Sequence, residues 1–230
     1  MRPVMPVILP CLALGLAPFI MQGTESILMI TFNTSLQKYG SDLAVGAMTI
    51  LSTVMQFTLL PLMGLSQGAQ PIISYNFGAR NSKRVKSAFM ALLKASIIFS
   101  AALWLAIELF PNIFARIFIA DTQLIEYAAK YLRIYIATSA LMGIQIACQQ
   151  TFIAIGNAKT SLFLALLRKV FLLIPLIYIL SLFINNKVTA VFMAEPIADF
   201  IAVTATAILF ILQFKKAINL LNSDKLKISY

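Results

Sequence analysis

The chain has 230 residues, of which 60% are hydrophobic and only 11% are charged, and its mean hydropathy is +0.91. This composition excludes a soluble globular domain and a disordered chain, and it predicts an all-α membrane protein that crosses the bilayer several times. The net charge of +10 does not indicate nucleic-acid binding, because the basic residues lie mainly between apolar stretches, where they orient membrane spans.

Several classes of chemistry are also excluded. There is no histidine, and the two cysteines, Cys11 and Cys148, lie far apart without a CxxC motif. Zinc sites and Ser-His-Asp triads are therefore not expected, and proton chemistry falls to carboxylates. The stretch "GLSQGAQ" lacks the Lys-Ser/Thr of a phosphate-binding loop. We expect no enzyme, no cofactor and no certain metal site.

A bilayer core needs about 20 apolar residues per helix. Six stretches meet this need, at about 7–35, 43–64, 87–110, 127–154, 159–184 and 188–213. We expect residues 1–214 to form one six-helix domain and residues 215–230 to form a basic tail. The second span stays apolar beyond residue 64, where Pro61 and Pro71 predict kinks and Gly64 and Gly68 predict close helix approach. Asn81 or Ser82 is expected to cap the third helix.

The loops also predict the orientation. With an even number of spans, both ends lie on one side of the membrane, together with the second and fourth loops. That side carries most of the basic residues, namely Arg2, Arg80, Lys83, Arg84, Lys86, Lys159, Lys215, Lys216, Lys225 and Lys227. The positive-inside rule therefore predicts that both termini are cytoplasmic.

Polar residues recur at helical spacing inside several spans. The first span carries Pro18, Gln22, Glu25, Met29 and Asn33 on one face, and the fourth carries Tyr131, Tyr135, Thr138, Met142, Gln145 and Gln149. The sixth adds Glu195 and Asp199 one turn apart, and the second adds Gln56. With a rise of about 1.5 Å per residue, Glu25, Thr138 and Asp199 each lie roughly 15 Å from the outer end of their span. This shared depth predicts a substrate cavity lined by Gln22, Met29, Asn33, Gln56, Thr138, Met142, Gln145 and Glu195.

The acids inside the spans have two interpretations. Carboxylates in membranes are costly and usually line pathways or proton relays, which favours coupling to an ion for Glu25 and Asp199. The alternative is a structural role, in which the acids pair with Arg168 or Lys169, nine or ten residues into the fifth span, and the neutral polar groups only link helices.

The segment "PLMGLSQGAQPIISYNFGARNSKRVKSAF", Pro61 to Phe89, resembles the signature at the turn between the second and third helices of a lobe in the multidrug and toxic compound extrusion (MATE) family. "PFIMQGTESILMITFN", "SLQKYGSDLAVGAMTI" and "FIAIGNAKTSLFLALLRKVFLLIPLIYIL" are similar to parts of the C-terminal lobe of bacterial MepA-type members. The resemblance covers essentially the whole chain.

The resemblance implies one six-helix lobe of a multi-pass exporter in the bacterial cytoplasmic membrane. Such an exporter moves amphipathic, cationic drugs out in exchange for H⁺ or Na⁺ and needs a matching N-terminal lobe. The family's cation site uses a first-helix acid, which Glu25 matches, and fourth-helix residues, for which this chain offers Tyr135 and Ser139. No acid lies between Glu126 and Glu195. The chain departs from the family's pattern in this respect, and this departure argues against a three-ligand Na⁺ site. Protons are then the expected coupling ion, with Asp199 as a substitute acid.

Two further interpretations stay open. The chain can be a non-transporting remnant or assembly subunit, which an adjacent reading frame for the other six helices would contradict. It can also be a flippase for lipid-linked precursors, for which a more basic cavity is expected than Arg168 and Lys169 provide.

Overall fold

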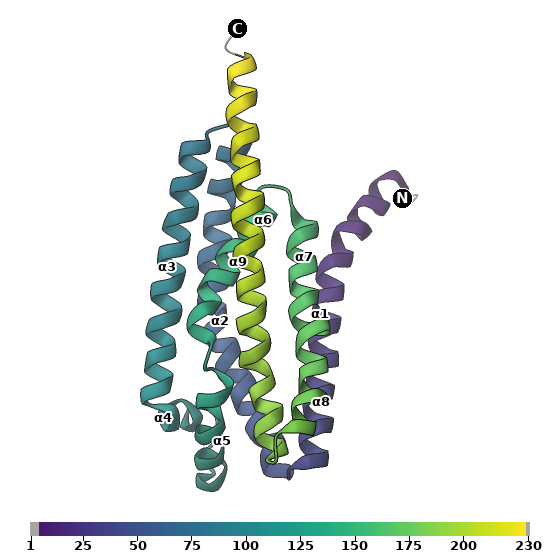
Figure 1. The fold of residues 1–230 in the computed structure, drawn as a ribbon, viewed down its shortest axis with the longest axis vertical. Coiled ribbons are helices and arrows are strands. Elements are labelled where there is room, and N and C mark those ends of the chain that lie inside the picture. The colour runs from purple at the N-terminus through teal and green to yellow at the C-terminus, as the bar shows by residue number, and fades with distance from the viewer. Residues whose placement is uncertain (1–4, 229–230) are drawn as a thin grey trace, which may run out of the picture.

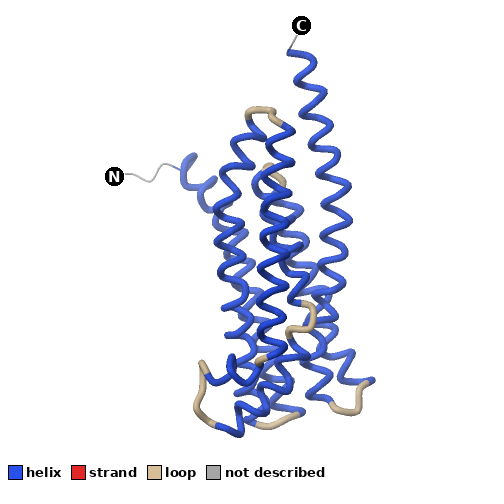
Figure 2. Tube along the Cα trace, turned by 90° about the vertical axis from the view of Figure 1, so that its left-hand side faces the viewer, coloured by secondary structure: helices blue, strands red, loops and turns tan. Residues whose placement is uncertain are grey.

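The computed structural model describes the backbone of residues 5–228 and the side chains of residues 19–20, 23–157 and 159–221. Within this part all regular elements are helices, joined by short loops, and there is no strand (Figures 1 and 2). In chain order the elements are α1 (Met5–Tyr39), α2 (Asp42–Gly78), α3 (Ser82–Leu109), α4 (Pro111–Arg116), α5 (Thr122–Tyr135), η1 (Ser139–Leu141), α6 (Met142–Ala154), α7 (Ala158–Leu166), η2 (Leu167–Leu173), α8 (Ile174–Phe183) and α9 (Lys187–Ile228).

The chain is an all-α membrane protein, as its composition predicts. Among the described residues, four helices are long and apolar enough to cross a membrane, and the bent pair 122–135 and 139–154 makes a fifth if it is one span. The first predicted span corresponds to the 35-residue helix α1, whose described side chains begin at Phe19. Lipid leaves no water to satisfy backbone groups, which is why the spans are helical.

Helix ends follow local sequence. Asn81 caps α3, as predicted, and its side-chain oxygen accepts a hydrogen bond from the backbone N–H of Arg84 at 3.2 Å. Asp121 caps α5 in the same way through the N–H of Gln123 at 2.9 Å. The helix α2 continues through Pro61 and Pro71 to Gly78. The helix α9 is continuous to Ile228, so the predicted domain boundary at 214 falls inside a helix.

The two ends of the bundle differ in which connections they hold. Figure 1 shows the start of α1, the α2–α3 turn, the α6–α7 turn and the end of α9 toward one end, with the α1–α2, α3–α4 and α8–α9 connections at the other. This arrangement is the one expected for an even number of spans. The exposed Arg80, Lys83, Arg84 and Lys86 follow α2 at the first end.

Apolar side chains fill the bundle between α1, α2, α5 and α9. Phe32, Leu51, Leu132 and Phe192 are among the largest side chains that are fully buried there. A second cluster holds α6 against α9 through Phe152 and Phe210, whose ring centroids are 5.1 Å apart. The helix α9 therefore contributes to both clusters, through Phe192 and Phe210.

The predicted fourth span is not one continuous helix. It is broken between Tyr135 and Met142, and its halves are bent by 51°. Tertiary hydrogen bonds occupy the break: Ser100 Oγ donates to the Ala140 carbonyl at 2.8 Å, and Thr138 Oγ1 donates to the Pro196 carbonyl at 3.3 Å. The single polar face expected along this span is therefore divided in two.

The predicted close approach at Gly64 and Gly68 is wrong. A Cβ at either glycine would meet no atom within 4 Å. The close contact lies instead at Gly143, where a Cβ would come 2.4 Å from the Ser96 carbonyl oxygen. A missing side chain allows close approach only where another helix is present, and here that helix is α3.

The predicted fifth span also contains an irregular stretch. Residues 167–173 form the π-helix η2, in which the N–H of Ile174 donates to the carbonyl of Lys169, five residues earlier. Pro175 follows at once, and a proline has no N–H and clashes with the carbonyl four residues before it. Widening the helix relieves this conflict, and π-bulges occur frequently at functional sites.

Candidate functional site

A cavity of about 460 Å³ lies between α1, α2, α5, η2 and α9. Its lining combines apolar walls with charged and polar groups from all five elements. The lining residues are Glu25, Leu28, Met29, Phe32, Met48, Ser52, Met55, Gln56, Leu59, Leu60, Met63, Tyr135, Arg168, Lys169, Leu173 and Glu195. Four methionines stand among them, and flexible thioethers adapt to ligands of different shape.

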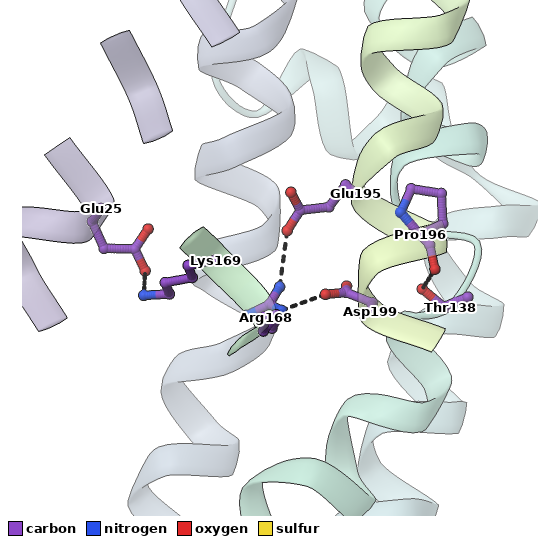
Figure 3. A network of polar contacts seen from close by, with 7 residues as sticks. All are labelled: Glu25, Thr138, Arg168, Lys169, Glu195, Pro196 and Asp199. Atoms are coloured by element: carbon purple, nitrogen blue, oxygen red, sulfur yellow. Dashed lines mark hydrogen bonds and ion pairs between the residues drawn. The ribbon is translucent and has the colours of Figure 1, made fainter. Parts of the chain in front are cut away.

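Two neighbouring basic residues of η2 hold the acids around this cavity (Figure 3). Arg168 reaches α9, where its Nη2 donates to Glu195 Oε1 at 2.8 Å and its Nε donates to Asp199 Oδ1. Lys169 points the other way and donates to Glu25 Oε1 on α1. The pair therefore links α1 to α9 across the fifth span.

The geometry of η2 explains why consecutive side chains serve different helices. Neighbouring residues on a helix point in different directions, and in a π-helix the angle between them is somewhat smaller than the roughly 100° of an α-helix. With η2 between α1 and α9, Arg168 is directed to the acids of one helix and Lys169 to the acid of the other (Figure 3). Since Glu195 and Asp199 are four residues apart on one face of α9, a single guanidinium reaches both.

The five charged groups differ in exposure. Asp199 and Glu195 are buried, and the Arg168 and Lys169 side chains are 14% and 12% exposed, whereas Glu25 is 52% exposed. The three acids and two bases carry one excess negative charge when all are ionised. The Glu195–Arg168–Asp199 group is thus the fixed part of the network, and Glu25 is the accessible part.

The structure brings together part of the predicted site. Of the predicted substrate-cavity residues, Met29, Gln56 and Glu195 line the cavity, as do Glu25 and Tyr135 from the predicted coupling group. Asp199 contacts the network through Arg168. Thr138 lies beside it through its bond to Pro196 (Figure 3).

Other predicted residues lie elsewhere. Asn33 borders a separate surface groove with Lys38. Ser139 is buried within the helix break, and Met142 and Gln145 are buried beyond it. Ser139 Oγ and Gln145 Oε1 find no hydrogen-bond partner among the described residues. The break at 136–141 separates them from Tyr135, which a continuous helix would have kept on their face. The side chain of Gln22 lies outside the described residues.

Arg168 and Lys169, which connect the acids of the site, were considered in the sequence only as possible ion-pair partners of those acids. Arg168 and Lys169 carried a usable signal, since two adjacent bases in the middle of an apolar span are costly without partners. Met48, Met55 and Met63 had no such signal, because methionine is ordinary in apolar helices, whereas Ser52 is one of the polar residues of the second span, as is Gln56. Among the described residues, no group of three or more His, Cys, Asp or Glu side chains gathers to hold a metal ion.

Comparison with known proteins identifies the bundle. The MatE family pattern matches residues 18–179, which is more than half of the chain and includes α2 to α7 and most of the cavity lining. The chain belongs to the MatE family. MATE proteins are membrane transporters rather than enzymes, and this multi-pass chain has the architecture of one MATE lobe.

Curated relatives are about twice as long or longer. The chain is 24% identical over 191 residues to the multidrug export protein MepA of Staphylococcus haemolyticus, covering 82% of this chain and 42% of that protein. It is 31% identical over 133 residues to the FAD transporter of Shewanella oneidensis, covering 58% of this chain and 29% of that one. The chain thus spans less than half the length of these relatives.

Solved structures show the same relation. An inward-facing multidrug resistance MATE family transporter superposes with a TM-score of 0.85 at 18% identity, over 97% of this chain and 50% of that one. The MATE multidrug transporter DinF-BH superposes with a TM-score of 0.74 at 33% identity, over 89% of this chain and 45% of that one. The bundle matches half of a MATE transporter.

Proposed function

We propose that this chain acts as one half of a MATE exporter that moves amphipathic, positively charged organic molecules out of the cell in exchange for H⁺ or Na⁺. The observation that carries the proposal is the cavity of about 460 Å³, with methionine walls and a net negative charge network at the middle of an apolar bundle. Charged groups at such depth are expensive and mark pathways.

The cavity suits a cationic amphiphile. Met29, Met55 and Phe32 supply polarizable and aromatic contact surface, and Glu25 supplies an accessible carboxylate within the same lining. Such pockets hold ligands mainly through apolar contact and use a few polar groups to orient them. A cation bound beside Glu25 would balance the excess negative charge.

The same excess supports ion coupling. Glu195 and Asp199 share one guanidinium, so one proton or monovalent cation makes the network neutral. The salt bridges are the pairing described above as the alternative interpretation of the acids. Coupling through Glu25, Asp199, Tyr135 and Ser139 therefore requires these pairs to exchange during transport, and protons are the ion that needs fewest additional ligands.

A second lobe and an orientation complete the proposal. Transporters built from repeats bind substrate between them, and this chain spans half of its structural neighbours. A matching N-terminal six-helix lobe would close the cavity. The basic end formed by the α2–α3 turn and the end of α9, with residues 215–230 as its tail, would face the cytoplasm of a bacterial cell.

The alternatives predict other properties. A flippase for lipid-linked precursors needs a more basic cavity, whereas here three acids accompany Arg168 and Lys169. Because one of the relatives is an FAD transporter, molecules other than drugs should be assayed together with the dyes. A non-transporting remnant would bind none of these molecules.

The test is dye efflux from cells that express the chain with and without a candidate N-terminal lobe, with pH and Na⁺ varied separately. We expect Glu25→Gln to abolish coupled efflux of an ethidium-type cation and to leave membrane insertion intact. The matched control is Lys94→Gln, at an exposed position of α3 outside the cavity lining. Efflux by Glu25→Gln at the wild-type rate would refute the proposal.

A further inference from the structure

The contact between Lys169 and Glu25 differs from the other ion pairs of the site. Arg168 is held by two buried carboxylates, so a ligand that displaced either one would leave a buried charge without a partner. Lys169 has one carboxylate partner, and that partner is half exposed. This pair is the one part of the described network that a ligand can open at low cost.

Opening the pair has different consequences for the two residues. A released Glu25 has room to reorient, because 52% of its side chain is not covered by the chain. A released Lys169 is only 12% exposed and remains inside the cavity lining, so its ammonium keeps a need for a counter-charge. A ligand that carries only a positive charge can pair with Glu25, but it leaves Lys169 without a counter-charge.

We propose that Lys169 is a binding subsite for a singly charged anionic group, such as a carboxylate, on an amphipathic ligand whose remainder occupies the methionine-lined cavity. The anionic group takes the place of the Glu25 carboxylate. A carboxylate matches in charge and shape the group that it replaces, whereas a dianion would add a further negative charge to a network that already has one in excess. The inference rests on the proposed function, since it concerns the same cavity.

The exchange gives the charge of residue 25 opposite effects on the two kinds of ligand. A neutral residue 25 cannot pair with Lys169 and leaves the subsite free, so an anionic group binds more tightly. A monocation depends on the Glu25 carboxylate, so it binds more weakly when that charge is removed. The other charged or titratable groups that face the cavity are Arg168, Glu195 and Tyr135, with Asp199 behind Arg168. Because the two ligands meet the same groups, opposite responses to Glu25→Gln report the Lys169–Glu25 exchange.

The experiment compares two dyes that differ in one group. A rhodamine ethyl ester is a monocation, and its free acid is a zwitterion with a carboxylate in place of the ester. Binding of each to the full chain in nanodiscs is measured by fluorescence anisotropy at one neutral pH, at which the carboxylate of the acid dye is ionised. The proteins are the wild type, Lys169→Gln, Lys169→Arg, Glu25→Gln and the control Lys94→Gln.

We expect Lys169→Gln to weaken binding of the acid about ten- to hundredfold, the usual range for a lost hydrogen bond to a charged group. The same change tightens binding of the ester, because Lys169 no longer competes with the cationic dye for the Glu25 carboxylate. Lys169→Arg restores the preference for the acid, Glu25→Gln tightens the acid and weakens the ester, and Lys94→Gln changes neither dye.

Two outcomes overturn the inference, and they are distinguishable. If the wild type binds the ester but the ratio of acid to ester affinity is the same in Lys169→Gln, the subsite is refuted and the proposed function stands. If the wild type binds neither dye, with or without the candidate N-terminal lobe, the proposed function fails as well. A merely structural role for Lys169 would weaken both dyes together and leave their ratio unchanged.

Discussion

Replacing Arg168 tests the charge network through the stability of the bundle. In Arg168→Gln, the carboxylates of Glu195 and Asp199 keep their buried positions and lose the guanidinium that both contact. Breaking a buried ion pair by removing one partner costs about 3–5 kcal/mol, because it leaves an uncompensated charge. Glu195, Arg168 and Asp199 together carry a net charge of −1, and Arg168→Gln can return to that net charge only by binding one proton.

The cost of that proton gives an independent value. Protonating one carboxyl costs about 1.4 kcal/mol for each pH unit above the value near 4 at which a free aspartic acid titrates, or about 4 kcal/mol at pH 7. The two values agree. The protonated form is favoured as pH falls, so the loss of stability in Arg168→Gln should be largest at high pH and should shrink by about 2.7 kcal/mol between pH 7 and pH 5.

The single tryptophan, Trp104 on α3, provides the signal. Its fluorescence is followed while the chain in mixed micelles is unfolded with SDS at pH 5, 6 and 7. Asp199→Asn should cost much less than Arg168→Gln, because Arg168 keeps Glu195. The double variant Arg168→Gln/Asp199→Asn should recover more than half of the loss, because one unpaired carboxylate remains instead of two. A loss in Arg168→Gln within about 1 kcal/mol of that in Lys94→Gln, with no dependence on pH, would refute the reasoning.

Three further predictions concern the helices that position the site, each measured by the same unfolding experiment. Gly143→Ala should destabilise the bundle by about 1–3 kcal/mol, because its Cβ would lie 2.4 Å from the Ser96 carbonyl oxygen. Gly64→Ala, where nothing lies within 4 Å, should instead be neutral or stabilise by up to about 1 kcal/mol, and equal effects at the two glycines would contradict this account. Thr138→Val should destabilise the bundle by about 1 kcal/mol, because it removes the hydrogen bond to the Pro196 carbonyl. The control is Thr204→Val, whose loss of stability should be smaller because the Thr204 hydroxyl donates to a carbonyl of its own helix. Asn157→Ala should cost about 1–2 kcal/mol, because Asn157 Nδ2 donates to Gln213 Oε1 at 2.6 Å and its Oδ1 accepts from Thr160 Oγ1 at 2.9 Å; an unchanged stability would show that this link does not hold α7 to α9.

The sequence by itself determined that the molecule is an all-α membrane protein, and it placed the cap of the third helix at Asn81 or Ser82. These properties depend on local features: apolar length sets where a helix can cross lipid, and a short polar side chain before a helix satisfies its free N–H groups. The sequence also predicts a similar depth for Glu25 and Asp199 in their spans, because the rise per residue of a helix is constant.

Only the tertiary structure decided which of these residues meet. The bend after Tyr135 moved Ser139, Met142 and Gln145 away from the cavity, and no proline or glycine between Tyr135 and Met142 marked it, because the bonds that occupy it come from α3 and α9. The same holds for Arg168 and Lys169: their charge was visible, but whether each acid faced water, lipid or a base depended on how α1 and α9 pack around η2. Contacts between segments distant in sequence follow from the packing of whole helices, and local pattern does not contain that information.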